Sequence, residues 1–213
     1  MLTSNRDNLL SLSHQYSFTN EQYERFVKYI ELLETWNQRT NLVSGNDLPR
    51  IVSRHIAESL LLTELDSVNK AGKIMDLGSG AGFPGIPLAI MYPDKYIHLV
   101  ESRNRKAAFL QQVVIDLEWS TVKVHGVRAE DLTVSSLAGA PDVITARAVS
   151  ALPNLWNWCH LLLDKSGCIL AYKGGDIENE LAGLKGQPVK TEIIPITGLP
   201  EETGRFFVKL SKI

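Results

Sequence analysis

The sequence is short of cysteine, lacks any long apolar run and carries almost no excess of charge. Only two cysteines, Cys159 and Cys168, occur among its 213 residues, in unrelated contexts. This excludes a disulfide framework and a Cys-x-x-Cys metal pair, so we expect reduced thiols, no bound metal and a cytoplasmic location. No apolar run is long enough to cross a membrane. The first residues also lack the basic and then apolar layout of a signal peptide.

The near balance of charge excludes one broad class of protein. Lysine and arginine together number 22, and aspartate and glutamate 24, which gives a formal net charge of −2. A protein that coats nucleic acid without selectivity carries a strong basic excess. Any binding to nucleic acid must therefore come from basic residues gathered on one face of the molecule.

From residue 73 onward, short apolar stretches alternate with helical patterns. Strands are predicted at 73–77, 96–100, 121–125, 142–145 and 167–172, and helices at 84–91, 103–117, 151–163 and 176–184. Such alternation predicts a mostly parallel sheet covered by helices on both faces. Two further apolar stretches, 189–196 and 206–210, are separated by Gly198, Pro200 and Gly204 and predict a closing hairpin. The pattern is that of a Rossmann-like α/β fold with seven strands.

The first 70 residues are predicted to be helical. A short helix is expected at 5–14, and the run from Thr19 to Gln22 is a capping box that opens a longer helix. Apolar residues recur in that longer helix at the spacing of one buried face. Asp47 and Pro49 begin a further helix, which we expect to run regularly from Arg50 to Leu65. Residues 1–70 are therefore interpreted as a helical extension packed on an α/β domain of residues 71–213.

A glycine-rich loop after the first predicted strand is the strongest local signal. Asp76, Gly78, Gly80 and Gly82 form the pattern D-x-G-x-G-x-G, followed directly by a helix that starts with prolines. Glycines at this spacing let the backbone turn through positive φ and approach a ligand closely. The free N–H groups of the helix would face whatever lies over the loop. A tight structural turn without a ligand remains an alternative.

The glycine spacing also fits the dinucleotide fingerprint G-x-G-x-x-G, through Gly80, Gly82 and Gly85. Two acids favour S-adenosylmethionine over a dinucleotide. A carboxylate at Asp76 would help to hold a cationic amino-acid group, through the loop backbone or water, whereas it offers nothing to a pyrophosphate. Glu101 ends the next strand, where an acid accepts hydrogen bonds from ribose hydroxyls. Because NAD enzymes share that acid, an oxidoreductase stays open as the rival.

Ligands of an open α/β sheet lie beyond the carboxyl ends of its strands. The candidate cofactor residues found there are Asp76, Gly78, Gly80, Gly82, Phe83, Glu101, Ser102, Arg128, Ala129, Glu130 and Arg147. Arg147 comes just after the predicted strand 142–145, at the mouth of the expected site. It would orient a carboxylate or phosphate by paired hydrogen bonds. The alternative is a structural ion pair with Glu101, Asp142 or Glu130.

Two common catalytic patterns are missing. Enzymes that methylate exocyclic amino groups of bases commonly carry an Asp/Asn-Pro-Pro-aromatic run after this strand, where the present chain has Thr-Ala-Arg-Ala-Val. Enzymes that methylate C5 of pyrimidines need a cysteine nucleophile, and Cys159 falls within a helical pattern as a packing residue. An acceptor with its own lone pair, such as a ring nitrogen, requires only alignment with the methyl group.

Basic residues gather near the same predicted edge. The candidate contacts to RNA are Arg54, His55, Arg103, Arg105, Lys106 and Lys173. Each one alone is typical of a solvated surface. Together with the acceptor argument they favour a polyanionic substrate, and Arg147 is the candidate catalytic residue.

These residues resemble the glucose-inhibited division protein B family. The matching runs are 54–60, 76–90, 101–110, 128–130, 147–149 and 173–174, with Trp36, Asn37, Asn41 and Leu42 in the N-terminal part. The extension Gly-Phe-Pro-Gly-Ile-Pro of the glycine loop is the most specific of them. The resemblance covers about residues 20 to 175.

The resemblance implies a class I S-adenosylmethionine-dependent methyltransferase that modifies N7 of one guanine in 16S ribosomal RNA. The near balance of charge favours the assembled small ribosomal subunit over naked RNA as the substrate, and naked RNA stays open. The resemblance also implies cofactor contacts at Gly78, Phe83, Ala129, Glu130 and Arg147. Apart from the resemblance, we expect a monomer with no membrane partner. Because the residue at position 129 varies among members, a backbone contact is expected there. A non-catalytic RNA-binding or assembly factor that retains the pocket is the remaining alternative.

Overall fold

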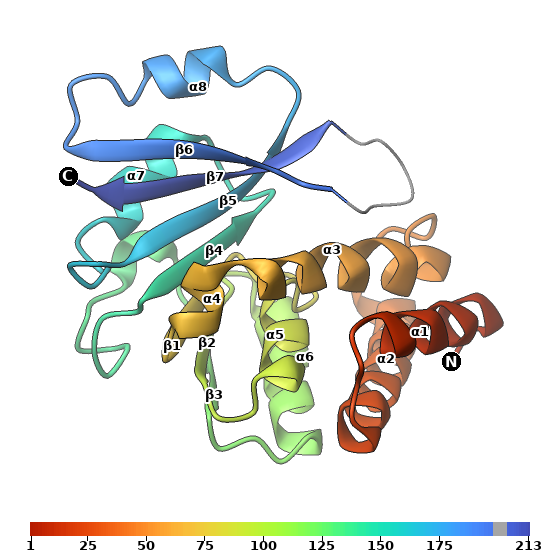
Figure 1. Cartoon of the computed structure of the whole chain (residues 1–213). Coiled ribbons are helices and arrows are strands. Elements are labelled where there is room, and N and C mark those ends of the chain that lie inside the picture. Colours follow the sequence, from red (N-terminus) through yellow and green to blue (C-terminus); the bar gives the residue numbers. More distant parts are fainter. Residues whose placement is uncertain (198–203) are drawn as a thin grey trace.

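The computed structural model describes residues 1–197 and 204–213 (Figure 1). Its centre is a seven-stranded sheet in the order β3-β2-β1-β4-β5-β7-β6. The strands are β1 (Lys73–Leu77), β2 (Tyr96–Val100), β3 (Val122–His125), β4 (Val143–Arg147), β5 (Cys168–Gly174), β6 (Val189–Pro195) and β7 (Arg205–Lys212). Strands β1 to β5 pair in parallel, whereas β7 is antiparallel to both β5 and β6. The predicted fold and closing hairpin are confirmed; Gly198 and Pro200 lie outside the described residues.

The helices were also predicted in the right order, with one exception. They include α1 (Thr3–Gln15), α2 (Asn20–Thr40), α5 (Gly85–Met91), α6 (Asn104–Asp116), α7 (Leu152–Cys159) and α8 (Glu178–Ala182), with a 3₁₀ turn η4 (Ala129–Asp131). The capping box is present, because Thr19 accepts from the Gln22 N–H and Gln22 accepts from the Thr19 N–H. Helix α7 ends earlier than the predicted residue 163, at Cys159.

The exception is the segment 48–70, where one helix was expected from Arg50 to Leu65. The chain instead forms a 3₁₀ turn η1 (Leu48–Arg50), a π-helical segment η2 (Ile51–Ile56), one α turn α3 (Ala57–Leu60), a 3₁₀ turn η3 (Leu61–Glu64) and a short α4 (Asp66–Lys70). Changes of helical pitch of this kind often mark functional sites. Here the π-helical segment and α3 carry His55 and Glu58, which both lie against the end of β4.

Two apolar layers cover the sheet. One cluster joins α1, α2, η2, α3, α5 and α6 to one face, and a second joins α7 and the segment 132–137 to the other. Neighbouring residues of a strand therefore enter different clusters, as Ile74 and Met75 do. The N-terminal helices share a core with the sheet because their apolar side chains belong to the same cluster (Figure 1). Among the described residues, no helix is long and apolar enough to cross a membrane.

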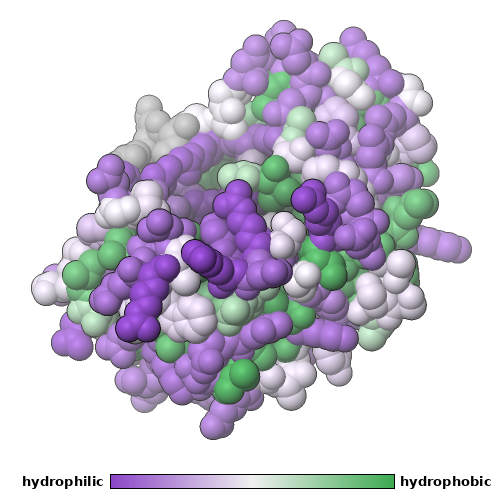
Figure 2. Space-filling model, turned by 180° about the vertical axis from the view of Figure 1, so that it is seen from behind, coloured by the Kyte–Doolittle hydropathy of each residue, from purple (hydrophilic) through white to green (hydrophobic). Residues whose placement is uncertain are grey.

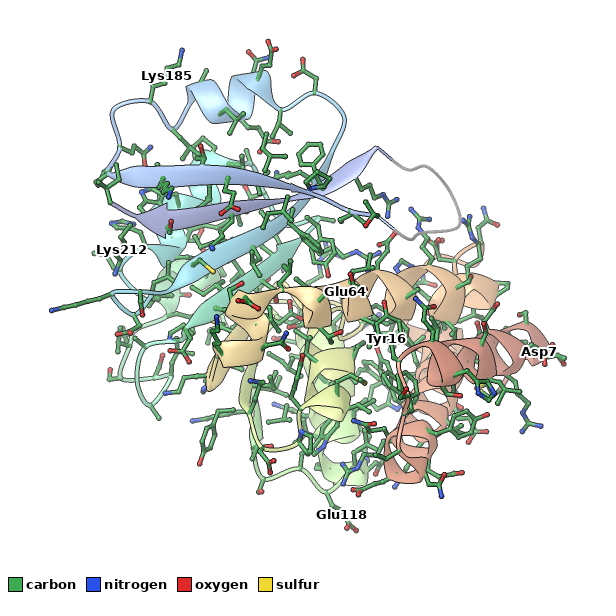
Figure 3. The ribbon with its side chains drawn as sticks, viewed as in Figure 1. Asp7, Tyr16, Glu64, Glu118, Lys185 and Lys212 are labelled. Atoms are coloured by element: carbon green, nitrogen blue, oxygen red, sulfur yellow. The ribbon has the colours of Figure 1, made fainter. Side chains whose placement is uncertain are left out.

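Polar contacts fasten the N-terminal part at its edge. Tyr16 at the end of α1 donates to a Glu64 carboxylate oxygen at 3.4 Å, and the two side chains meet in Figure 3. Burial and Glu64 raise the pKa of Tyr16 to about 12, so the phenol stays protonated near neutral pH. In the view of Figure 2, green apolar residues form separate patches divided by purple polar ones.

A histidine pair on β2 and β3 makes stability depend on pH. The Nδ1 atom of His98 lies 2.8 Å from Nε2 of His125. Burial and then His125, Lys73 and Lys123 lower the pKa of His98 from 6.5 to about 4. The folded state therefore binds fewer protons than the unfolded chain between these two values, and this contribution to stability is lost as pH falls through them.

We expect His98→Gln to flatten that dependence. The difference in free energy of unfolding between the wild type and the variant should shrink from about pH 7 to about pH 4.5, as measured by urea denaturation. Asp76, with its pKa raised to about 6, acts in the opposite direction but is present in both proteins. If this difference in free energy of unfolding stays constant or grows as pH falls, His98 is not the source of the pH dependence.

Candidate functional site

The glycine loop between β1 and α5 has the predicted backbone. Gly78, Gly80 and Gly82 have φ values of +69°, +59° and +107°. A Cβ atom at Gly78 would lie 2.7 Å from a methyl group of Val149, which is tighter than real contacts allow. The loop therefore requires glycine both for its conformation and for the close approach of the segment after β4.

Asp76 supports this loop from below. Its carboxylate accepts from the Gly85 N–H at 3.0 Å and from the Thr145 hydroxyl at 2.9 Å, and its side chain is fully buried. Burial raises the pKa of Asp76 to about 6 despite these hydrogen bonds. Gly82, the last glycine of the loop, is also buried. Neither residue lines the cavity above the loop, so any effect of Asp76 on a ligand there would pass through the loop backbone, as expected from the sequence.

A cavity of about 470 Å³, called here the loop cavity, opens above the glycines. Predicted cofactor residues and predicted RNA residues line it together. Its lining residues are Leu42, Val43, Asp47, His55, Gly78, Ser79, Gly80, Ala81, Phe83, Glu101, Ser102, Arg103, Lys106, Arg147, Ala148 and Val149. His55, Arg103 and Lys106 therefore belong to the wall of the same cavity as the glycine loop.

Glu101 lines both the loop cavity and a smaller one. One carboxylate oxygen accepts from the Gly80 N–H at 3.0 Å and the other from the Arg103 N–H at 2.8 Å, and the residue is buried. The smaller cavity, called the side cavity, measures about 180 Å³. It is lined by Leu77, Gly78, Val100, Glu101, Ser102, Val127, Arg128, Ala129, Glu130, Val149 and Trp158. The strands thus bring Glu101 and the segment 128–130 together as predicted.

Arg147, the last residue of β4, has partners that the sequence did not indicate. Its Nη2 atom lies 2.8 Å from a Glu58 carboxylate oxygen and 2.6 Å from Nδ1 of His55. Its Nη1 atom is buried and has no hydrogen-bond partner among the described residues. The predicted structural partners are wrong: Asp142, for example, accepts from the N–H groups of Gly72 and Lys73.

His55 is held as a neutral ring. It stacks on Phe83 with ring centroids 5.0 Å apart and an interplanar angle of 22°. Burial, followed by the charge of Arg147, lowers the pKa of His55 to about 3. Because the guanidinium can only donate, Nδ1 of His55 is the acceptor in their contact, and the ring proton is on Nε2. His55 is therefore a wall and an acceptor for Arg147 rather than a cation for RNA.

A third cavity of about 510 Å³, called the outer cavity, lies on the other side of Arg147. It shares Arg147, Ala148 and Val149 with the loop cavity. Its remaining lining residues are Arg54, Glu58, Ser150, Ala151, Tyr172, Lys173, Gly174, Glu180 and Arg205. Lys173 donates to the Ser150 carbonyl at 2.8 Å and pairs with Glu180 at 2.7 Å. Sequence reasoning missed Glu58, Tyr172, Glu180 and Arg205, because their importance comes only from this assembly.

The single basic rim expected from the sequence is divided in the structure. Arg54 pairs with Asp47 at 2.8 Å and lines the outer cavity with Lys173. Arg103 and Lys106 line the loop cavity. Arg105 is exposed on α6 and lines none of the three cavities. Of the six candidate RNA contacts, only Arg105 therefore lies entirely outside the three cavities.

Neither cysteine is suited to nucleophilic catalysis. Both are free and buried, and burial raises the pKa of Cys159 to about 12. A thiol at that pKa holds almost no thiolate near neutral pH. Within residues 1–197 and 204–213, no group of histidine, cysteine, aspartate and glutamate side chains is arranged to hold a metal ion.

Comparison with known proteins gives a consistent result. Residues 22–197 match the GidB family, described as rRNA small subunit methyltransferase G. The chain is 37% identical over 215 residues to Ribosomal RNA small subunit methyltransferase G of Roseiflexus castenholzii, covering 96% of this chain and 92% of that protein. The protein of the same name from Aster yellows witches'-broom phytoplasma is 34% identical over 198 residues, with 91% and 93% covered. The crystal structure of M. jannaschii TYW2 in complex with AdoMet is similar in fold alone, with a TM-score of 0.55, 15% identity, and 75% and 76% of the two chains covered.

Proposed function

The chain belongs to the rRNA small subunit methyltransferase G family, and from that premise we propose that it transfers a methyl group from S-adenosylmethionine to N7 of one guanine in 16S ribosomal RNA. The observation that carries the proposal is the meeting of two cavities at Arg147. One cavity lies over the glycine loop and the other opens beside it, with Arg147, Ala148 and Val149 in both walls. A cofactor on one side and an acceptor on the other would meet there.

The residues present fit the cofactor. Gly78 and Gly80, both at positive φ, line the loop cavity without a side chain, and a Cβ at Gly78 would already collide with Val149. We assign Gly78, Gly80 and Phe83 to the methionine side of the cofactor. Glu101 and Ser102 are assigned to the ribose. The residues Arg128, Ala129 and Glu130 of the side cavity are assigned to the adenine.

The cofactor supplies an electrophilic methyl group on a sulfonium centre. Guanine N7 attacks with a lone pair and has no proton to lose, so this chain needs no general base, and orientation is its main contribution. This agrees with the absence of an available thiolate and with a neutral His55. Arg147 is assigned as the residue that touches the reacting groups, because its buried Nη1 atom has hydrogen-bonding capacity left at the junction.

The remaining proposals concern the setting of the enzyme. We propose that residues 1–70 are an N-terminal extension and residues 71–213 the methyltransferase domain, with a core that continues from one to the other. We also propose a monomer in the cytoplasm, a compartment that keeps thiols such as the two buried cysteines reduced. The substrate is proposed to be the small ribosomal subunit. The dinucleotide-dependent oxidoreductase is set aside, because the family is one of methyltransferases.

The exposed Arg105 is expected to contact RNA without touching the cofactor. We expect Arg105→Ala to weaken binding to the small subunit and to lower the slope of log affinity against log salt by about one, as for one lost phosphate contact. The dissociation constant for S-adenosylhomocysteine should not change, because Arg105 lines none of the cavities.

Lys106→Ala on the same helix is the comparison for Arg105. Lys106 lines the loop cavity, and its Nζ atom lies 3.5 Å from the Leu42 carbonyl oxygen. Its loss should therefore weaken cofactor binding as well as RNA binding. Both affinities are measured by titration at several salt concentrations. Unchanged RNA affinity in Arg105→Ala, or equal loss of cofactor affinity, would contradict the assignment.

The proposed reaction is tested directly with radiolabelled cofactor. Purified protein is incubated with tritiated S-adenosylmethionine and small ribosomal subunits from a strain lacking this gene, and stripped 16S RNA is used in parallel. Label at N7 of a single guanine is the expected result, and the better substrate of the two identifies the form that is recognised. No label on either substrate, with RNA still bound, would overturn the proposal in favour of a non-catalytic RNA-binding factor.

A further inference from the structure

Glu58 is a buried carboxylate that the proposed reaction does not yet use. Only 3% of its side chain is exposed, although it lies between two guanidinium groups. The Oε2 atom forms an ion pair with Arg147 at 2.8 Å but makes no hydrogen bond among the described residues, and Oε1 pairs with Arg205. The three residues come from three different elements, α3, β4 and β7. A buried ion of this kind is costly unless its partners are well placed.

The charges in this group do not balance. Among the described residues, Glu58 is the one carboxylate that pairs with either Arg147 or Arg205, so two cations share a single anion. Arg147 also has a buried Nη1 atom with no hydrogen-bond partner within residues 1–197 and 204–213, and its neighbour His55 is neutral. An oxyanion entering at the junction of the two cavities would satisfy both the spare charge and the free donor.

The backbone that carries Glu58 is itself fixed. The Tyr172 hydroxyl donates to the Glu58 carbonyl at 3.1 Å, which ties α3 to β5. The Ser59 hydroxyl donates to the His55 carbonyl one turn earlier, at 2.6 Å. These contacts hold the backbone of Glu58 in place, whereas a free arginine side chain has many rotamers and loses considerable entropy when it is ordered. Anchoring Arg147 in advance removes that cost from the reaction.

We propose that Glu58 is a positioning residue, which holds Arg147 so that its Nη1 atom is ready for an oxyanion at the junction. The oxyanion is either the carboxylate of the cofactor or a phosphate of the acceptor nucleotide. The effect of Glu58 on methyl transfer rests on the proposed function. The contact between Glu58 and Arg147, in contrast, is present in the protein without any ligand. The helical extension thereby supplies part of the reaction site rather than only packing against it.

The inference is tested by combining Glu58→Gln with Arg147→Lys in a double-mutant cycle. If Glu58 acts through Arg147, Glu58→Gln alone should lower kcat/KM about tenfold, and it should add almost nothing in the Arg147→Lys background. A rise in the dissociation constant of S-adenosylhomocysteine identifies the cofactor carboxylate as the oxyanion. A rise in KM for the small subunit, with cofactor binding unchanged, identifies the phosphate instead.

The matched control is Glu64→Gln, near the end of the same helical segment. Glu64 is exposed and lines none of the three cavities, so this variant should keep the wild-type kcat/KM. Effects of Glu58→Gln and Arg147→Lys that simply add would overturn the inference, and so would wild-type activity of Glu58→Gln. Thermal denaturation shows whether each variant is folded.

NMR reports on the environment of the Arg147 side chain without requiring methyl transfer, so it separates this inference from the proposed function. The Nε–H resonance of Arg147, assigned by its loss in Arg147→Lys, should shift in Glu58→Gln in the absence of RNA and cofactor. An unmoved resonance would refute the positioning role, whether or not the wild type methylates RNA. If Glu58→Gln does not fold, Glu58→Asp is used instead. It keeps the charge but shortens the side chain by one methylene, which moves the carboxylate away from Arg147, and a shift of the Arg147 resonance is expected here too.

Discussion

Replacing Arg147 with alanine is expected to lower kcat/KM for methyl transfer by about ten- to a hundredfold. A hydrogen bond to a charged group contributes about 1.5–3 kcal/mol, and each 1.4 kcal/mol corresponds to about a factor of ten in rate. Arg147 has one guanidinium nitrogen, at the junction of the two cavities, that finds no hydrogen-bond partner in the part of the chain that the structure describes. Its loss should therefore be felt in the reaction more than in folding.

The fold is expected to survive this change because Glu58 keeps a second partner. Its carboxylate still pairs with Arg205 after Arg147 is lost, so the buried charge is not left alone. Thermal denaturation together with single-turnover methyl transfer separates the two effects. Lys185→Ala is the control, because Lys185 is exposed and points away from the molecule in Figure 3. An unchanged transfer rate in Arg147→Ala would remove this residue from the site.

The second large expected effect is a loss of stability, seen as a lower Tm, in the variant Gly85→Ala at the start of α5. A Cβ atom there would lie 2.2 Å from a methyl carbon of Leu99 and 2.8 Å from a carboxylate oxygen of Asp76. The Gly85 N–H also donates to that carboxylate at 3.0 Å. Overpacking of a filled core costs about 1–3 kcal/mol. For a protein of this size each kcal/mol lowers Tm by about 2–4 °C.

Gly45→Ala is the matched control for that variant. A Cβ atom at Gly45 would meet nothing within 4 Å, so its Tm should stay close to that of the wild type. Gly85→Ala should in addition weaken S-adenosylhomocysteine binding, because the displaced Asp76 supports the glycine loop. Equal Tm values for the two variants would show that the packing around Gly85 yields easily.

Local patterns were sufficient for most of the fold. The capping box at Thr19, the alternation of strands and helices from residue 73, and the glycine loop each depend on neighbours in the sequence, and each is found in the structure. The helix expected at 50–65 is the place where local patterns were not sufficient. Its composition permits a regular helix, but packing against α1 and α5 is accompanied by a π-helical segment and 3₁₀ turns.

In the candidate site, too, the sequence predicted some features and missed others. Residues that end parallel strands were grouped correctly, since the ends of such strands lie on one edge of a sheet; Glu101 and the segment 128–130 line one cavity. Asp76 belongs to the same pattern, but its side chain is turned beneath the loop toward Gly85 and Thr145. Sequence spacing gives a residue's position along a strand, whereas its partners decide what its side chain does.

The sequence by itself determined the order of elements, the glycine loop and the family, because these depend on short runs of neighbouring residues. Only the tertiary structure decided the environment of Arg147. Its partners Glu58 and His55 come from the N-terminal helical segment, and Arg205 reaches the same carboxylate from β7. Burial then sets their electrostatics: a solvated histidine has a pKa near 6.5, whereas the buried His55 beside a guanidinium has one near 3. Desolvation and contacts between distant segments exist only once the chain has folded, so no local pattern could have shown them.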